Sequence, residues 1–215
     1  MRCWRGLCLV LLWLCTAPLA GNALAAGLQA GRDFRLLDPP LAAEKQDRIE
    51  VIEFFWYGCP HCFDFEPVLE GWAKTLPPDV VLRRVPAIFH SKWAPGAQLY
   101  YTLEALHLTD ALHREVFNAM HVERLRLNDE SVLFGWAAKQ GIDATAFAAA
   151  WNSFGVQSRV REAQRLTQES RITGVPALVV GGRYQALTTG NYGDLLQNTV
   201  QLIIRVRGEQ PATEK

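Results

Sequence analysis

Cysteine is scarce in this sequence, and most of it lies at the amino end. The chain has 215 residues and five cysteines, but only Cys59 and Cys62 follow the first 25 residues. A structural zinc site needs four ligands, normally supplied by a second cysteine pair or by histidines at helical spacing. No second pair is present, and no two of the histidines at positions 90, 107, 113 and 121 are spaced to share a helix face one turn apart. The sequence therefore predicts no metal site.

An excess of charge of one sign is also missing. The 22 basic and 22 acidic side chains balance, and charged residues make up only 20% of the chain. Proteins that bind nucleic acid or anionic membranes usually carry a basic excess, so we expect neither partner. With 49% hydrophobic residues and no internal repeat or low-complexity tract, the composition is that of a globular protein. Its length fits one domain that carries an insertion.

The apolar run at the amino terminus is too short for a membrane span. Arg2 and Arg5 precede the run from Leu7 to Leu14, and Asn22-Ala23-Leu24-Ala25 then ends in the pattern Ala-x-Ala. A span needs about 20 apolar residues, whereas this order of positive charge, short apolar core and small residues is typical of a secretory signal peptide. We expect cleavage after Ala25 and export of the remaining chain.

The rest of the sequence predicts an α/β core interrupted by helices. Residues 48–56 are rich in β-branched and aromatic side chains, as in a buried central strand, and a helix is expected to begin at Cys59. Residues 79–85 have the pattern of a second strand, parallel to the first because a crossover helix joins the two. The further expected elements are helices over 98–106, 110–120, 131–140, 144–152 and 157–168, strands over 177–180 and 183–185, and a last helix over 192–206.

The Cys59-Pro60-His61-Cys62 motif has three ordinary explanations: half of a zinc site, a structural disulfide, or a redox-active dithiol. Ligand count argues against zinc, and a disulfide that closes so short a loop would stabilise the fold little. Placement favours redox chemistry, because the amino end of a helix stabilises a thiolate at Cys59. Pro60 fits the first turn, and His61 can bring positive charge or a hydrogen bond to the sulfur. A pair whose reduced form is stabilised in this way is a strong oxidant.

Three features together carry a resemblance to a known family. They are the Cys-Pro-His-Cys motif after Glu53-Phe54-Phe55, a helical segment of suitable length, and Thr173-Gly174-Val175-Pro176 before a late strand. In these features the chain resembles the DsbA family of periplasmic thiol:disulfide oxidoreductases. The resemblance implies a thioredoxin-like α/β fold with an inserted all-helical domain. The implied division is a signal peptide over 1–25, a thioredoxin-like domain over 26–90 and 170–207, a helical insert over 91–169 and a tail over 208–215.

The resemblance also implies roles for individual residues. Cys59 forms the mixed disulfide with a substrate, and Cys62 resolves it. Val175 and Pro176 form a cis-proline loop that faces the cysteines, where the backbone of Val175 can pair with an unfolded peptide whatever its sequence.

Glu53 is a carboxylate in the middle of an apolar strand. Such a group is either paired with a basic residue, for which Lys74 and Lys92 are candidates, or has a raised pKa. The resemblance supports a functional role, in which Glu53 relays a proton to or from Cys62. Both interpretations stay open at the level of the sequence.

The implied function is donation of the Cys59–Cys62 disulfide to newly exported, unfolded proteins in the periplasm. The implied partner is a DsbB-like quinone reductase of the inner membrane that reoxidises the pair. We expect a monomer with no separate cofactor, because the disulfide itself carries the two electrons. The alternatives are a disulfide isomerase or reductase of the same superfamily and a peptide-binding chaperone whose disulfide is incidental. The reduction potential separates them.

Overall fold

A computed structural model describes residues 27–42, 44, 47–188 and 190–209. Five strands of this part of the chain form one sheet, in the order β1-β5-β4-β2-β3. They are β1 (Phe34–Leu36), β2 (Ile49–Phe55), β3 (Val80–Pro86), β4 (Ala177–Val180) and β5 (Tyr184–Ala186). Strands β2 and β3 are parallel, as predicted, and the other neighbouring pairs are antiparallel. The signal peptide expected over 1–25 lies outside the described residues.

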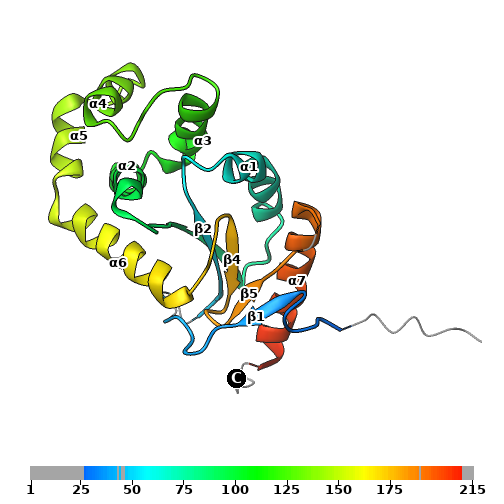
Figure 1. The fold of residues 1–215 in the computed structure, drawn as a ribbon. Coiled ribbons are helices and arrows are strands. Elements are labelled where there is room, and N and C mark those ends of the chain that lie inside the picture. The colour runs from blue at the N-terminus through cyan, green and yellow to red at the C-terminus, as the bar shows by residue number, and fades with distance from the viewer. Residues whose placement is uncertain (1–26, 43, 45–46, 189, 210–215) are drawn as a thin grey trace, which may run out of the picture.

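Helices cover both faces of the sheet. Helix α1 (Pro60–Ala73) joins β2 to β3, and α7 (Tyr192–Glu209) follows β5. Between β3 and β4 come the short 3-10 helix η1 (Ser91–Trp93) and helices α2 (Ala94–Ala105), α3 (Thr109–His121), α4 (Glu130–Lys139), α5 (Ala144–Trp151) and α6 (Phe154–Ser170). Figure 1 shows α1 and α7 on one side of the sheet and α2 to α6 grouped on the other. No helix among the described residues is long and apolar enough to cross a membrane.

Strand β2 lies at the centre of the core, and all seven of its residues are buried. Val51 belongs to a hydrophobic cluster that includes side chains of α1 and α7. Ile52 and Phe54 belong to a second cluster, formed with the helices between β3 and β4. Successive side chains of a strand point to opposite faces, so β2 contributes to both cores. This double packing fixes the end of β2, where the cysteine motif begins.

Two helices begin three or four residues earlier than the sequence predicts. Helix α2 starts at Ala94 rather than at residue 98, because Pro95 fits the first turn, where a missing amide hydrogen removes no helical bond. Helix α6 starts at Phe154 rather than at residue 157, because the Ser153 hydroxyl accepts a hydrogen bond from the Val156 amide at 3.2 Å. Such a cap satisfies one of the unpaired amides of the first turn.

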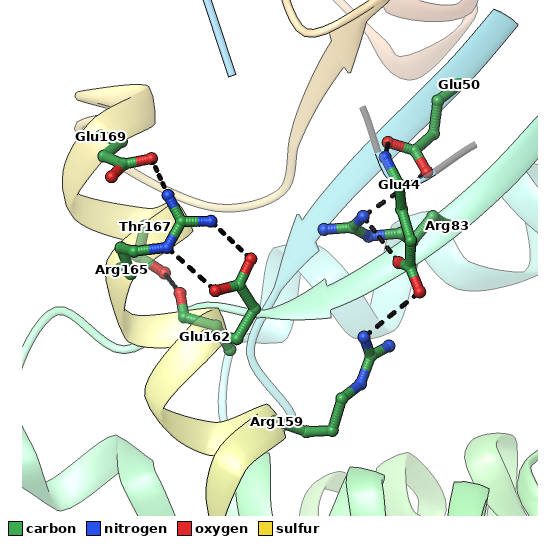
Figure 2. Close-up of polar contacts among 9 residues, drawn as sticks. Glu44, Glu50, Arg83, Arg159, Glu162, Arg165, Thr167 and Glu169 are labelled. Atoms are coloured by element: carbon green, nitrogen blue, oxygen red, sulfur yellow. Dashed lines mark hydrogen bonds and ion pairs between the residues drawn. The ribbon is translucent and has the colours of Figure 1, made fainter. Parts of the chain in front are cut away.

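Neighbouring arginines on β3 neutralise buried acids on opposite faces of the sheet. On the face covered by α6, Arg83 Nη1 lies 2.7 Å from Glu44 and 3.5 Å from Glu50, which is buried. Arg159 of α6 reaches the same Glu44 at 3.3 Å (Figure 2). Arg84, the next residue on β3, turns to the α1 face instead. Since buried carboxylates need a compensating charge, these contacts account for acidic residues inside an apolar strand.

Candidate active site

The two cysteines lie at the start of α1 and differ in exposure. Cys59 immediately precedes the helix, with extended backbone angles of φ −89° and ψ 118°, and Pro60 is the first helical residue. Cys59 is 9% exposed, whereas Cys62 is 0% exposed. Both are free thiols in this structure. Of the two sulfur-bearing side chains, only that of Cys59 is therefore partly open to solvent.

The surroundings of Cys59 favour its thiolate. The Cys62 thiol, the amides of Cys62 and His61 and the charge of His61 all favour a negative charge on the Cys59 sulfur. Against the opposing effect of burial, these groups lower the pKa of Cys59 to about 6. The amides form no capping hydrogen bond of ordinary geometry with the side chain, so they act chiefly through their dipoles. Cys59 is therefore mostly ionised at neutral pH.

The surroundings of Cys62, in contrast, favour its protonated form. Burial raises the pKa of this thiol far above its usual range, and the adjacent Cys59 sulfur raises it further. Cys62 therefore needs a proton whenever a disulfide to Cys59 opens. The pair therefore consists of one partly exposed thiolate, the form that the motif favours for Cys59, and one buried thiol.

A segment far along the chain completes the site. The Cys59 sulfur lies 3.5 Å from the carbonyl oxygen of Val175, across 116 residues, and donates a hydrogen bond to it when protonated. The Val175–Pro176 peptide bond is cis, as the resemblance implies. Pro176 directly precedes β4, and the pairing of β4 with β2 brings this segment beside the start of α1.

Glu53 is buried and has an arginine as its partner. Its Oε2 lies 3.2 Å from Nε of Arg84, although the two atoms are not aligned as a hydrogen bond. The expectation of Lys74 or Lys92 as the partner is wrong, because Lys74 pairs with Glu70 at the surface and Lys92 is exposed. The parallel register places Arg84 directly opposite Glu53, and the sequence does not reveal that register.

The protonation of Glu53 fits both interpretations of this residue. Burial raises the pKa of Glu53 to about 8, with Arg84 opposing the rise and Glu66 adding to it. The charge of Glu53 in turn raises the pKa of Cys62, so the two groups interact. A carboxyl group with a pKa in this range can exchange its proton near neutral pH. Glu53 is thus both paired and able to serve as an acid.

Three further buried residues, which the sequence analysis missed, extend this polar cluster. Arg84 Nη2 donates to Glu66 Oε1 at 2.6 Å, and Glu66 Oε2 lies 3.3 Å from His113 Nε2. Nδ1 of His113 is hydrogen-bonded to the Tyr57 hydroxyl at 2.7 Å, and burial lowers the pKa of His113. The spacing of Glu66, one turn after Cys62, was a signal that it faces the core. The contacts themselves join residues of β3, α1 and α3, which are far apart in the sequence. No local sequence pattern could therefore predict them.

A groove and a pair of stacked rings border the cysteines. The groove, of about 470 Å³, is lined by residues that include His61, Val175, Pro176 and Tyr192. On the η1 side, the rings of Trp56 and Trp93 stack with their centroids 4.1 Å apart. Gly58 leaves room for them, because a Cβ atom there would clash with the Trp56 ring and force it to move. The surface around Cys59 is therefore both concave and aromatic.

Comparison with known proteins gives one family. The DSBA-like thioredoxin domain family matches residues 79–201, a stretch that begins after Cys62. The thiol:disulfide interchange protein DsbA of Bordetella parapertussis is 43% identical over 200 residues, which cover 90% of this chain and 95% of the relative. The protein of that name from Azotobacter vinelandii is 39% identical over 197 residues, covering 86% and 91%.

Solved structures agree with these relatives. The crystal structure of Pseudomonas aeruginosa DsbA superposes with a TM-score of 0.80 and 34% identity, covering 85% of this chain and 96% of that chain. The oxidoreductase DsbA from Xylella fastidiosa gives a TM-score of 0.79 at 29% identity, covering 84% and 98%. The expected α/β, thioredoxin-like fold with a helical insertion is confirmed. The chain belongs to the DsbA family of thiol:disulfide interchange proteins.

Proposed function

We propose that this chain donates the Cys59–Cys62 disulfide to newly exported, unfolded proteins in the periplasm. The observation that carries the proposal is the inequality of the two cysteines: Cys59 is reachable and has a lowered pKa, whereas Cys62 is buried and has a raised one. The contacts around Cys59 favour its thiolate, which exists only in the reduced pair. A pair whose reduced form is stabilised passes its disulfide on readily.

The transfer begins when a client thiolate attacks the Cys59 sulfur of the oxidised pair. A client–Cys59 disulfide forms as the bond to Cys62 breaks, and Cys62 leaves with the electron pair and takes up a proton. A second client thiolate then attacks the client sulfur of the mixed disulfide, and Cys59 leaves as a thiolate. Two electrons have then passed to the cysteine pair, and the client has gained one disulfide.

Glu53 supplies the proton to Cys62 in this scheme. Its raised pKa, caused chiefly by burial, keeps it protonated at neutral pH and therefore ready to donate. The carboxylate that remains lies 3.2 Å from Arg84, which stabilises the negative charge. When the pair is reoxidised, the proton returns along the same route. Glu53 thus acts as a general acid and base for the buried cysteine.

The client binds beside Cys59 along the backbone of Val175. The carbonyl of Val175 already lies 3.5 Å from the sulfur, so an extended peptide that pairs with this backbone brings its own cysteine to Cys59. Main-chain pairing of this kind tolerates many sequences. Pro176 and the adjoining groove offer apolar surface to the client side chains, while Pro60 holds the first helical turn in place.

Location and reoxidation complete the proposal. The signal peptide is cleaved after Ala25, and the remaining chain works in the periplasm as a monomer. A DsbB-like quinone reductase of the inner membrane removes the two electrons from Cys59 and Cys62. The thioredoxin-like domain spans 26–90 and 170–207, and the insert spans 91–169, a division that the helices α2 to α6 support.

Equilibration with glutathione buffers tests the direction of the reaction. We expect a reduction potential well above the cytosolic glutathione poise of about −220 to −260 mV, together with disulfide transfer to reduced, unfolded ribonuclease. A potential near or below that range would contradict the oxidase function and favour a reductase or isomerase. Binding of the ribonuclease without any disulfide transfer would instead favour a chaperone.

A further inference from the structure

Tyr192 links α7 to the turn that holds the cysteines. It is the first residue of α7, and its hydroxyl donates a hydrogen bond to the carbonyl oxygen of His61 at 2.9 Å, across 131 residues. Its ring packs against Phe65 of α1, with ring centroids 4.8 Å apart. In the part of the chain that the structure describes, no other side chain donates a hydrogen bond to the backbone between Cys59 and Cys62.

The carbonyl that Tyr192 contacts belongs to a peptide group that faces the reacting sulfur. The carbonyl of His61 and the amide of Cys62 form one peptide unit, and that amide is directed toward the Cys59 sulfur. This is the usual direction of the third helical amide behind a capping residue. A hydrogen bond accepted by a carbonyl polarises its peptide group and strengthens the N–H as a donor, by about 10–30%. The Tyr192 hydroxyl therefore reinforces the electrostatic field at Cys59 without contacting it.

Tyr192 remains a donor over the pH range in which Cys59 ionises. Burial raises the pKa of the Tyr192 hydroxyl, and the charges of Asp64 and Cys59 raise it further. The hydroxyl thus keeps its proton when the Cys59 thiolate forms. A carbonyl oxygen has two lone pairs, so this bond adds to the helical hydrogen bond of the same group.

We infer that Tyr192 is a positioning residue that strengthens the dipole of the His61–Cys62 peptide group, whose N–H faces the sulfur of Cys59. The inference rests on the proposed function, in which Cys59 is the sulfur that exchanges. It gives α7, at the far end of the sequence, a part in determining how oxidising the cysteine pair is. Tyr192 also lines the groove beside Pro176, so a substitution there can change client binding as well as the stability of the Cys59 thiolate. Exchange rates with clients would combine both effects, whereas equilibrium measurements report the thiolate alone.

The test compares Tyr192→Phe with Tyr184→Phe. The first variant removes the hydroxyl and keeps the ring on Phe65, and the second removes a hydroxyl that donates to Glu209 on the β5 side of the molecule. Thiolate absorbance of each reduced protein is titrated from about pH 4 to 8, where Cys62 stays protonated. We expect Tyr192→Phe to raise the Cys59 pKa by about 0.3 unit and to shift the glutathione equilibrium about twofold toward the oxidised protein. Tyr184→Phe is expected to change neither.

The amide proton of Cys62 provides a second measurement. Its NMR signal is expected to move upfield in reduced Tyr192→Phe, because a weaker donor is less deshielded. An unchanged titration in Tyr192→Phe, or an equal change in Tyr184→Phe, would overturn the inference. A wild-type protein with no low-pKa thiolate would refute the proposed role of Cys59 instead, so the two failures are distinguishable.

Discussion

Glu53 and Arg84 lie directly opposite one another on the parallel strands β2 and β3, with Oε2 and Nε 3.2 Å apart. The same guanidinium donates to Glu66 at 2.6 Å. One cation thus serves two buried carboxyl groups, and a single positive charge compensates only one of them. Protonation of the other removes the excess charge. This arrangement explains why Glu53 can hold a proton at neutral pH although an arginine lies beside it.

Arg84→Met is expected to destabilise the fold far more than Glu53→Gln. Loss of the arginine leaves Glu66 buried without its cation, a change of about 3–5 kcal/mol in the free energy of unfolding. Glutamine mimics a protonated Glu53 and leaves the Arg84–Glu66 pair intact. Urea unfolding of the two oxidised variants measures the difference, with Lys74→Met as the control for an exposed pair. Equal losses in the first two variants would contradict the shared-cation arrangement.

Glu53→Gln is expected to slow disulfide transfer by about 100-fold or more. Glutamine cannot donate the proton that Cys62 needs as the disulfide opens. Glu50→Gln is a matched control, because Glu50 is also a buried acid of β2 but contacts Arg83 on the other face of the sheet. Quenched-flow kinetics with a reduced cysteine peptide at neutral pH compares the two. If Glu50→Gln slows transfer as much, proton donation by Glu53 is not the cause.

His61→Ser is expected to make the pair less oxidising. His61 contributes to the lowered pKa of Cys59 through its amide and its charge, and serine keeps only the amide. The thiolate titration should therefore move to higher pH, by up to about one unit for an exposed charge. His90→Ser, at an exposed position near Trp93, is the control. An unchanged titration would show that the imidazole of His61 does not stabilise the Cys59 thiolate.

Cys59→Ser is expected to abolish disulfide exchange, whereas Cys62→Ser should accumulate mixed disulfides. Only Cys59 can be reached by a client, and without Cys62 no internal thiol resolves the complex. Mass spectrometry of the proteins after incubation with an oxidised peptide identifies the complexes. Trapping by Cys59→Ser in place of Cys62→Ser would reverse the assigned roles.

The stability of the reduced form is expected to rise with pH relative to the oxidised form. The pKa of Cys59 is lowered from 9.0 to about 6 in the folded protein, so folding favours the ionised thiol between these values. The advantage grows by up to about 1.4 kcal/mol per pH unit from about 6 to 9 and is lost as the pH falls through 6. Glu53, whose raised pKa acts in the opposite direction, is present in both forms and cancels in the comparison. Guanidinium unfolding of both forms at several pH values measures the effect, and a pH-independent difference would contradict it.

Much of the fold and the central motif could be predicted from local patterns. The β-branched and aromatic residues of 48–56 predict a buried strand, which the structure gives as Ile49–Phe55. The helix after it follows from Pro60 and the apolar spacing. The cysteine motif consists of four consecutive residues, so its redox chemistry can be inferred from the sequence alone. Val175 and Pro176 could be placed only through the family resemblance, because nothing local shows that this segment faces Cys59.

Contacts fixed by strand register or by helix docking could not be predicted. Arg84 reaches Glu53 because β2 and β3 pair in one particular register, and a shift of one residue would bring Arg83 to that face instead. Tyr192 reaches His61 only because α7 packs beside α1, and the residues are 131 positions apart. The electrostatics of the site depend on such contacts. The direction of the Cys59 pKa shift could therefore be predicted from the sequence, but the charged and polar side chains around the two cysteines could not.

The hydrogen bond between Cys59 and Val175, across 116 residues, has a consequence for the order of events during synthesis. The cysteine motif leaves the ribosome long before Val175 and the residues of β4 and α7 that surround it. A partly synthesised chain therefore carries two thiols without the later contacts that tune them. The mature reactivity arises only when the carboxy-terminal quarter has been made and has folded onto β2 and α1. A chain that ends before Val175 therefore lacks the contacts that surround Cys59 in the complete fold.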